Sequence, residues 1–504
     1  MNRSVFVRVA AAIAVAVVGL SLMGCLGQRS FFAGRTFPPS TILQRVLVAI
    51  QNPSPITKGQ LQIVDARYDI RNAENGSVPS FFVSGYAGAL PSAILNYPEQ
   101  SSGFVYGYGD GSLAVVNYAS EQQSGTIAGL TPNLPTGAVY VTEDGNYAFG
   151  ANQAAQYLTV IDRVHGVTVN LNLPNVYKVA VNPSGTVAMA YVQNSNYAYR
   201  VIHLQQPNGM IAPVPTFPNE ANWPAAVSPV NCQPINIPVF CVVPVLDQNG
   251  NPIQFDRPNN AIFSSDGTTA WVLNCGPECG NNNPDPVTTQ ATASVSFLGT
   301  GVLNIYNFPG STYPTPTPPT QTQPTEAARI PVPGGATMAL YGNGLLYISG
   351  QQLQKDGLFE GFLSVMNLST RKINNMYPIA DGTHTKMLFA DDNTLWIGSQ
   401  LCQVGERTAT NKTNGCLTMF NLNKNSVLVE PWYGDLTGLC AISQWHKVYT
   451  AYGGQLHIYA TTNTGITTTT TGYSAGSELY NGNVTVTGTA YDVAYMDAIS
   501  NAAD

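Results

Sequence analysis

Apolar and polar residues alternate in short runs along most of this chain, and turn residues join the runs. The segment Val176–Leu204, VYKVAVNPSGTVAMAYVQNSNYAYRVIHL, holds three such runs, separated by NPSG and NSN. A period of two puts alternate side chains on opposite faces of a strand, and Gly or Asn accepts the positive φ of tight turns. The pattern therefore predicts three antiparallel strands.

The same pattern recurs at intervals of about 40 residues. One copy, GAVYVTEDGNYAFGANQAAQYLTVID, begins at Gly137 and puts Asp144 at the turn position that Ser184 has in the first segment. Further copies begin at residues 260, 336, 385 and 436, and a degenerate one at 93. A repeat of this length with four short strands is typical of a propeller blade, which buries its faces only by stacking on neighbours.

The two ends of the repeat region complement each other. RVLVAIQN from Arg45 has the pattern of a second strand, and TAYDVAYMDA from Thr489 that of a first strand, so we expect them to share one blade. The prediction is an all-β chain with a single β-propeller of four-stranded blades, closed by pairing of the N- and C-terminal strands. Eight blades are favoured and seven are the alternative. The propeller spans 45–497, with loop insertions at 205–258 and 311–325 and a C-terminal tail at 498–504.

The first 24 residues have the layout of a signal peptide, with two arginines before an apolar stretch. The stretch ends in Leu22-Met23-Gly24-Cys25, which resembles the bacterial lipobox. That resemblance implies a lipid on Cys25, a lipidated tether over 25–44 and a chain held at the membrane by the lipid. Leu26 favours the outer membrane. An ordinary signal peptide or a single transmembrane helix is the alternative.

The amino-acid composition limits the classes of binding partner that can be expected. Charged residues make up 10% of the 504 residues, and the net charge is −7. Such a chain has no clustered basic residues to neutralise phosphates, so it is not expected to bind nucleic acid. Low charge with abundant Gly and Pro is typical of extracellular all-β proteins.

Besides Cys25 the chain has seven cysteines, and the signal peptide implies a compartment that permits disulfides. Short spacings indicate three disulfides: Cys232 with Cys241, Cys275 with Cys279, and Cys402 with Cys416. A zinc site at the C-x₃-C pair is the alternative, but no second pair or histidine has a matching spacing. Cys440 lies in an apolar run and is expected to be a buried free thiol.

Two copies carry a recognisable signature. AYVQN at residues 190–194 and AWVLN at 270–274 resemble the Tyr-Val-Thr-Asn motif of secreted YVTN-type repeats, and LTVIDRVHG at 158–166 resembles the strand and turn that follow it. The resemblance implies a β-propeller close to the lactonase-type propellers. Its motifs are structural, so it supports the fold more than the function.

Candidate chemistry is sparse. A metal or acid–base centre at the channel mouth needs several carboxylates or imidazoles on the innermost strands, yet the aligned positions are Ala138, Lys178, Asn260, Lys386 and Leu439. His384, Asp381, Asp435 and Asp492 are the candidate catalytic residues. Asp144, Asp266 and Asp392 occupy equivalent hairpin turns, where short acidic side chains bind backbone amides. No metal and no cofactor are predicted.

The loops offer the remaining candidates. Trp223, Trp432 and Tyr433 lie in or beside loops, where an aromatic side chain can stack on a sugar or anchor a partner. The predicted function is a lipid-anchored, monomeric, non-catalytic binding scaffold of the cell envelope, with an envelope protein or a glycan as its partner. The alternative is a lactonase-like hydrolase that acts on a sugar lactone at the channel mouth.

Overall fold

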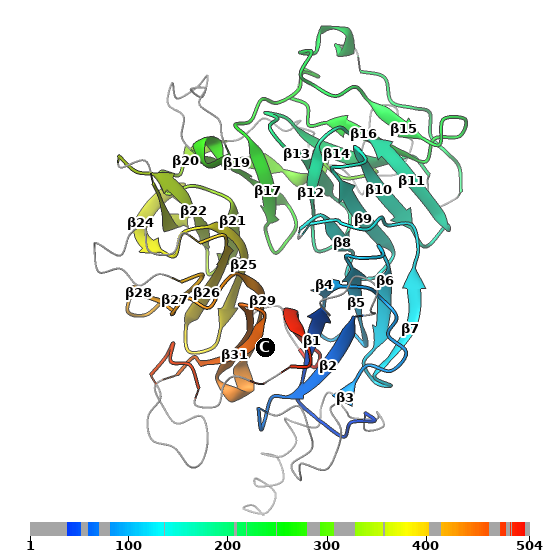
Figure 1. Ribbon diagram of the computed structural model, residues 1–504. Helices are drawn as coiled ribbons and strands as arrows, with labels where there is room; N and C mark the ends of the chain where they lie inside the picture. Colours follow the sequence, from blue (N-terminus) through cyan, green and yellow to red (C-terminus); the bar gives the residue numbers. More distant parts are fainter. Residues whose placement is uncertain are drawn as a thin grey trace, which may run out of the picture.

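A computed structural model places the strands in eight antiparallel sheets arranged as blades around a central axis (Figure 1). It describes residues 38–51, 59–69, 81–135, 137–205, 209–217, 219–247, 249–279, 293–306, 328–355, 358–402, 415–462, 474–479, 484 and 486–498. The all-β, eight-bladed propeller expected from the repeats is confirmed. Cys25, the signal segment and the 311–325 insertion lie outside the described residues. None of the described helices is long and apolar enough to cross a membrane.

The first blade joins the two ends of the described chain. Its strand order is β3-β2-β1-β32, with β1 at Arg45–Gln51, β2 at Gln60–Asp65, β3 at Phe81–Phe82 and β32 at Thr489–Tyr495. β1 pairs with β32 from Val46 opposite Tyr495 to Gln51 opposite Thr489. The predicted closure is therefore confirmed, and β32 is the innermost strand of this blade.

The next blades run outward from the axis in chain order (Figure 1). Blade 2 is β4 (Pro91–Leu95), β5 (Ser102–Gly107), β6 (Leu113–Asn117) and β7 (Gln122–Ile127); blade 3 is β8 (Val139–Val141), β9 (Tyr147–Asn152), β10 (Tyr157–Asp162) and β11 (Val167–Asn172). Blade 5 is β17 (Pro258–Phe263), β18 (Thr269–Asn274), β19 (Ser294–Gly299) and β20 (Ala328–Pro331); blade 6 is β21 (Met338–Gly342), β22 (Leu345–Leu353), β23 (Phe359–Asn367) and β24 (Lys372–Ile379); blade 7 is β25 (Thr383–Ala390), β26 (Thr394–Gln400), β27 (Leu417–Asn421) and β28 (Ser426–Val429).

Blades 4 and 8 depart from the four-strand pattern. Blade 4 begins with the opening segment, as β12 (Val176–Val181), β13 (Ala188–Val192) and β14 (Ala198–His203). Its outer strands, β16 (Phe240–Pro244) and β15 (Asn231–Gln233), come from the 205–258 segment. That segment was expected to be a loop insertion, but part of it completes the blade. Blade 8 is β29 (Leu436–Ile442), β30 (Lys447–Tyr452) and β31 (Gln455–Ala460), and isolated bridges to Val484 and Glu478 lie at its outer edge.

Two of the three aspartates at equivalent hairpin turns bind the backbone, as their positions predict, whereas Asp392 bonds to the Thr461 hydroxyl (2.9 Å) and the His446 ring (2.8 Å). Asp144 accepts hydrogen bonds from the Asn146 amide (3.0 Å) and the Thr142 hydroxyl (2.5 Å). Asp266 accepts one from the Thr268 amide at 3.0 Å. Each is followed by a glycine in the left-handed region, at φ 69° for Gly145. These carboxylates hold the turns between the first and second strands.

The hydrophobic core lies between neighbouring blades. Trp271 of β18 packs on Tyr341 of β21 with ring centroids 5.2 Å apart, and Trp396 of β26 packs on Tyr459 of β31 at 5.7 Å. Both indoles are buried. The expected inter-blade packing of these two tryptophans is confirmed, and each of them joins its sheet to the next one.

Candidate functional site

A β-bulge interrupts the innermost strand in six of the eight blades. The shift in pairing falls between residues 91 and 93 of β4, 176 and 178 of β12, 258 and 260 of β17, 384 and 386 of β25, 436 and 438 of β29, and 49 and 50 opposite β32. A bulge adds one residue and turns its side chain out of the regular alternation. The extra residues include Tyr177, Asn259, Thr385 and Tyr491, and all four line one cavity at the axis.

This cavity, here called the mouth cavity, has a volume of about 680 Å³. It lies where the innermost strands begin and the second strands end. Its walls are mostly uncharged polar and aromatic groups. The lining residues are Tyr108, Pro135, Tyr177, Lys178, Val192, Gln193, Asn194, Ser195, Arg257, Pro258, Asn259, Glu278, Cys279, Thr337, Gln351, Thr383, Thr385, Gln400 and Tyr491.

Lys178 is the residue of the opening segment that we expected to face the channel, and it lines the mouth cavity. Its ammonium group donates a hydrogen bond to Asn259 Oδ1 at 2.5 Å and lies 5.7 Å from the ring centroid of Tyr177. The Tyr177 hydroxyl donates to the same oxygen at 3.1 Å. Two bulge residues therefore fix the position of the lysine.

Glu278 is the one carboxylate among the residues that line this cavity. It lies on a short 3₁₀ turn, η2 (Gly276–Cys279), which the Cys275–Cys279 disulfide closes. Its Oε2 accepts a hydrogen bond from the Gln351 amide of β22 at 3.0 Å. Gly335 permits this approach, because at φ +86° a Cβ there would lie 2.4 Å from Gln351 N and 2.9 Å from Glu278 Oε2.

Burial shifts both charged groups toward their neutral forms. It lowers the pKa of Lys178 to about 8, against a smaller opposing effect of Glu278, and raises the pKa of Glu278 to about 7, against hydrogen bonds from Gln351 and the charge of Lys178. Both shifts follow from the loss of hydration around a charge. Both pKa values therefore lie within about one unit of neutral pH.

A second, smaller cavity of about 280 Å³ lies further along the innermost strands. Lys386 Nζ and Asp492 Oδ1 form an ion pair of 3.0 Å in its wall. Asp492 is 2% exposed and also accepts a hydrogen bond from the Ile94 amide at 2.8 Å. This pair joins three innermost strands, β4, β25 and β32.

The four candidate catalytic residues take separate positions. His384 is 2% exposed, its Nε2 bonds to the Ala380 carbonyl at 3.0 Å, and burial lowers its pKa to about 4, so the ring is neutral. Asp435 accepts a hydrogen bond from the Leu401 amide at 2.7 Å. Asp492 lies in the ion pair with Lys386, and Asp381 precedes β25. None of the four lines the mouth cavity.

The cysteines pair as their spacing suggests. Disulfides join Cys232 to Cys241, Cys275 to Cys279 and Cys402 to Cys416. The remaining cysteine of the described residues, Cys440, is buried and free, and burial raises the pKa of its thiol. Three disulfides are typical of a protein in an oxidising, extracytoplasmic compartment.

The candidate binding aromatics differ in exposure. Trp432 and Tyr433 are 49% and 42% exposed and precede β29, on the face that contains the mouth cavity. Tyr433 stacks on His457 with centroids 4.4 Å apart and donates to Glu478 Oε2 at 3.0 Å. Trp223 packs against Phe217 and donates its indole N–H to the Gly250 carbonyl at 3.0 Å, so it anchors the 205–258 segment.

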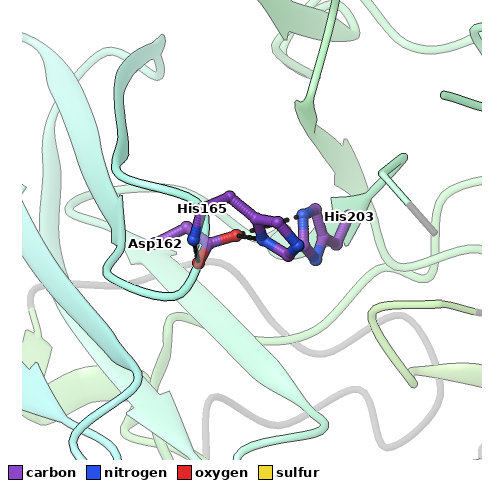
Figure 2. A group of neighbouring side chains, drawn as sticks. All are labelled: Asp162, His165 and His203. Atoms are coloured by element: carbon purple, nitrogen blue, oxygen red, sulfur yellow. Dashed lines mark hydrogen bonds and ion pairs between the residues drawn. The ribbon is translucent and has the colours of Figure 1, made fainter. Parts of the chain in front are cut away.

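One cluster was not anticipated from the sequence. Asp162 and His165 of blade 3 lie against His203 of blade 4 (Figure 2). The aligned repeats could have revealed it, because LTVID and YRVIH are the third strands of adjacent repeats. They put Asp162 and His203 at equivalent positions. Histidines scattered along the sequence become neighbours through this repeat.

Comparison with known proteins agrees with the fold. No protein-family model and no curated protein matches the chain. Among solved structures it is similar to the dihydro-heme d1 dehydrogenase NirN in complex with DHE, with a TM-score of 0.51 and 12% identity over 92% of this chain and 79% of that chain. It is also similar to the periplasmic gluconolactonase PpgL of Pseudomonas aeruginosa (TM-score 0.39, 15% identity, 90% and 98% covered) and to apo AztD from Citrobacter koseri (0.45, 9%, 89% and 97%). At these identities the similarity concerns the β-propeller fold alone.

Proposed function

We propose that this protein is an extracytoplasmic β-propeller that binds a glycan at the mouth cavity without transforming it. The observation that carries the proposal is the lining of that cavity. Asn259, Gln351, Thr383 and Thr385, whose side chains carry amide or hydroxyl groups, line it together with tyrosines. Neutral donors and acceptors beside aromatic rings suit hydroxyl-rich sugar rings.

One hydroxyl group in the wall of the cavity makes no hydrogen bond with the described residues. Thr385 Oγ1 is buried and has no hydrogen-bond partner there. A buried polar atom without a partner is costly unless a ligand or water satisfies it. Thr385 is also a bulge residue, so its position in the cavity depends on a local interruption of β25. We therefore assign this hydroxyl to ligand binding, with a rotation about χ1 that turns it from the buried side of the wall into the cavity.

The disulfides support an extracytoplasmic location, and we propose that a lipid on Cys25 anchors the chain to the envelope, with the outer membrane as the favoured site. Exposed Trp432 and Tyr433, on the same face as the mouth cavity, provide additional contact surface for an extended glycan or an envelope protein. Mass spectrometry of the membrane fraction tests the anchor, since an unmodified Cys25 or an intact N-terminus would contradict it.

Calorimetric titration of the full chain with a panel of neutral mono- and oligosaccharides tests the binding proposal. Thr385→Val removes the unpartnered hydroxyl and keeps the shape of the side chain. Thr337→Val is the matched control, because Thr337 lines the same cavity but donates its hydroxyl to the Ser349 carbonyl at 3.3 Å. We expect Thr385→Val to weaken sugar binding about 5- to 10-fold, by one hydrogen bond, and Thr337→Val to leave it nearly unchanged. Equal effects of the two variants, or no binding of any sugar, would contradict the proposal.

A hydrolase acting on sugar lactones is the second candidate. The observation that favours it is the pair Lys178 and Glu278, whose pKa values of about 8 and about 7 suit proton transfer at neutral pH. A lactone-hydrolysis assay distinguishes the two functions. If lactones are hydrolysed and Glu278→Gln abolishes hydrolysis while sugar binding persists, the enzyme interpretation replaces the scaffold.

A further inference from the structure

Asp162, His165 and His203 form a compact group at the junction of blades 3 and 4 (Figure 2). Asp162 ends β10, His165 lies in the turn that follows it, and His203 ends β14. One potential ligand atom from each residue lies within 4.8 Å of the others. We propose that this group is a binding site for a divalent transition-metal ion, with Zn²⁺ as the ion that its ligands suit best.

The distances are close to those of a zinc site. With Zn–N and Zn–O bonds of about 2.0–2.2 Å, neighbouring ligands of a tetrahedral ion lie about 3.4 Å apart. Asp162 Oδ2 is 3.5 Å from His203 Nε2. It is 2.7 Å from His165 Nδ1, a hydrogen-bond distance, so a metal that replaces the shared proton would separate these two atoms by roughly 0.7 Å. His165 is exposed on a turn and can make that small movement.

His203 points toward this position a ring nitrogen that makes no hydrogen bond with the described residues, and that nitrogen offers a lone pair when Nδ1 carries the ring proton. The side chain is 1% exposed, and its Nε2 has no hydrogen-bond partner among the described residues. The other ring nitrogen, Nδ1, lies 3.2 Å from the Tyr306 hydroxyl, and the ring stacks on Phe240 with centroids 4.2 Å apart. A neutral imidazole, oriented through its second nitrogen, is the usual form of a histidine ligand.

The carboxylate is also held in place. Asp162 Oδ1 accepts hydrogen bonds from the Val164 and His165 amides at 2.9 and 3.1 Å. Oδ2 therefore faces the two imidazoles, in a side chain that is fully buried. A cation bound there would compensate a buried negative charge. His165 lies toward solvent, which leaves water as the fourth ligand of a three-residue site.

The same turn recurs in blade 7 without the metal ligands. Asn421 ends β27, and its Oδ1 accepts hydrogen bonds from the Asn423 and Lys424 amides at 3.1 and 2.9 Å. Asn421 therefore stabilises the turn in blade 7 in the same way as Asp162 stabilises the turn in blade 3. Lys424 takes the position of His165. An amide is sufficient to hold the turn, so the turn alone does not explain the carboxylate and the two histidines.

The site is separate from the mouth cavity. Third strands run from the mouth face to the opposite face, so the ends of β10 and β14 lie on the far face of the ring. A second cluster, Asp391, Asp392 and His446, is a poorer candidate. It offers one imidazole instead of two, and the Thr461 hydroxyl already donates to both of its carboxylates.

The test is titration of the full chain, freed of metal by a chelator, with Zn²⁺ in competition with a zinc-binding dye. All variants carry His446→Asn, which removes the second cluster and keeps a residue that tolerates the positive φ of 52° at this position. Asp162→Asn copies Asn421 and keeps the turn. His165→Lys copies Lys424. Lys424→His is the matched control, since it adds a histidine beside Asn421 but no second imidazole.

We expect one tightly bound Zn²⁺ per chain, a loss of affinity of at least 10-fold in Asp162→Asn and His165→Lys, and no added site in Lys424→His. Co²⁺ should give the visible absorption of a four-coordinate ion in the parent and not in Asp162→Asn. The proposal is overturned if the parent binds no stoichiometric zinc, or if Asp162→Asn, folded as judged by its melting temperature, binds zinc as tightly as the parent.

Discussion

Arg45 should be the residue whose loss most weakens closure of the ring. It begins β1, and its side chain is 1% exposed between two buried carboxylates, Asp497 after β32 and Glu121 of blade 2. The guanidinium donates to Asp497 at 2.5 and 3.1 Å, to Glu121 at 3.0 Å and to the Tyr118 carbonyl at 2.5 Å. One side chain therefore joins the first strand, the closing strand and the next blade.

Arg45→Met keeps most of the volume and removes every one of these hydrogen bonds. Both carboxylates are then left buried without their counter-ion, and breaking a buried pair in this way costs about 3–5 kcal/mol. Arg45→Lys keeps the charge but loses the two-pronged geometry, so its cost should be smaller, about 1.5–3 kcal/mol for a lost charged hydrogen bond. The measurement is denaturant unfolding at pH 7, followed by tryptophan fluorescence.

Two further variants separate pairing from packing. Arg163→Met is the control, because Arg163 is exposed and its guanidinium donates to the Gly145 carbonyl. The combination of Arg45→Met with Glu121→Gln and Asp497→Asn removes the unpaired charges and should recover much of the lost stability. The reasoning is refuted if Arg45→Met unfolds within about 0.5 kcal/mol of Arg163→Met, the range of ordinary surface substitutions.

Three other outcomes are expected. Burial, with the charge of Glu478, raises the pKa of Glu430 from 4.5 to about 8, so its contribution to stability is fully present below pH 4.5 and is lost as the pH rises through 8. Glu430→Gln should remove a slope of up to about 1.4 kcal/mol per pH unit from melting curves recorded between pH 5 and 8, and an unchanged slope would contradict the shift. Replacing Cys402 and Cys416 by serine breaks a disulfide between residues 14 positions apart in the sequence and should cost about 3 kcal/mol in denaturant unfolding, whereas a cost near zero would contradict the loop-entropy reasoning. Cys440 should resist alkylation in the native protein and react after unfolding, as mass spectrometry can show, because burial raises the pKa of its thiol.

The fold could be predicted from the sequence because every blade repeats the same physical solution. Alternating runs and turn residues such as Asp144 and Gly145 specify each hairpin locally, and the patterns at Arg45 and Thr489 indicate the closure. The first three strands of blade 4 were predicted, but its outer strands, β15 and β16, were not, because they lie in a long proline-rich segment in which the repeat spacing is lost. Strands that do not follow the spacing of about 40 residues cannot be found from that spacing.

The site was harder to predict for a related reason. Alternation put Asn260 and Lys386 at the mouth, but the bulges turn the residues before them, Asn259 and Thr385, into the cavity. A bulge adds one residue to one strand, and the composition hardly changes. Glu278 reaches the cavity through a disulfide-closed turn outside the strands, which no pattern of apolar residues would reveal.

The shared first blade also constrains the order of folding. β1 lies near the beginning of the described chain, and its partner β32 follows roughly 440 residues later. At synthesis rates of about 5–20 residues per second, the inner edge of β1 stays without that partner for about 20–90 s. An unpaired edge of buried residues such as Val46 and Val48 is prone to pair with other chains. The nascent protein therefore needs protection from aggregation until the ring can close.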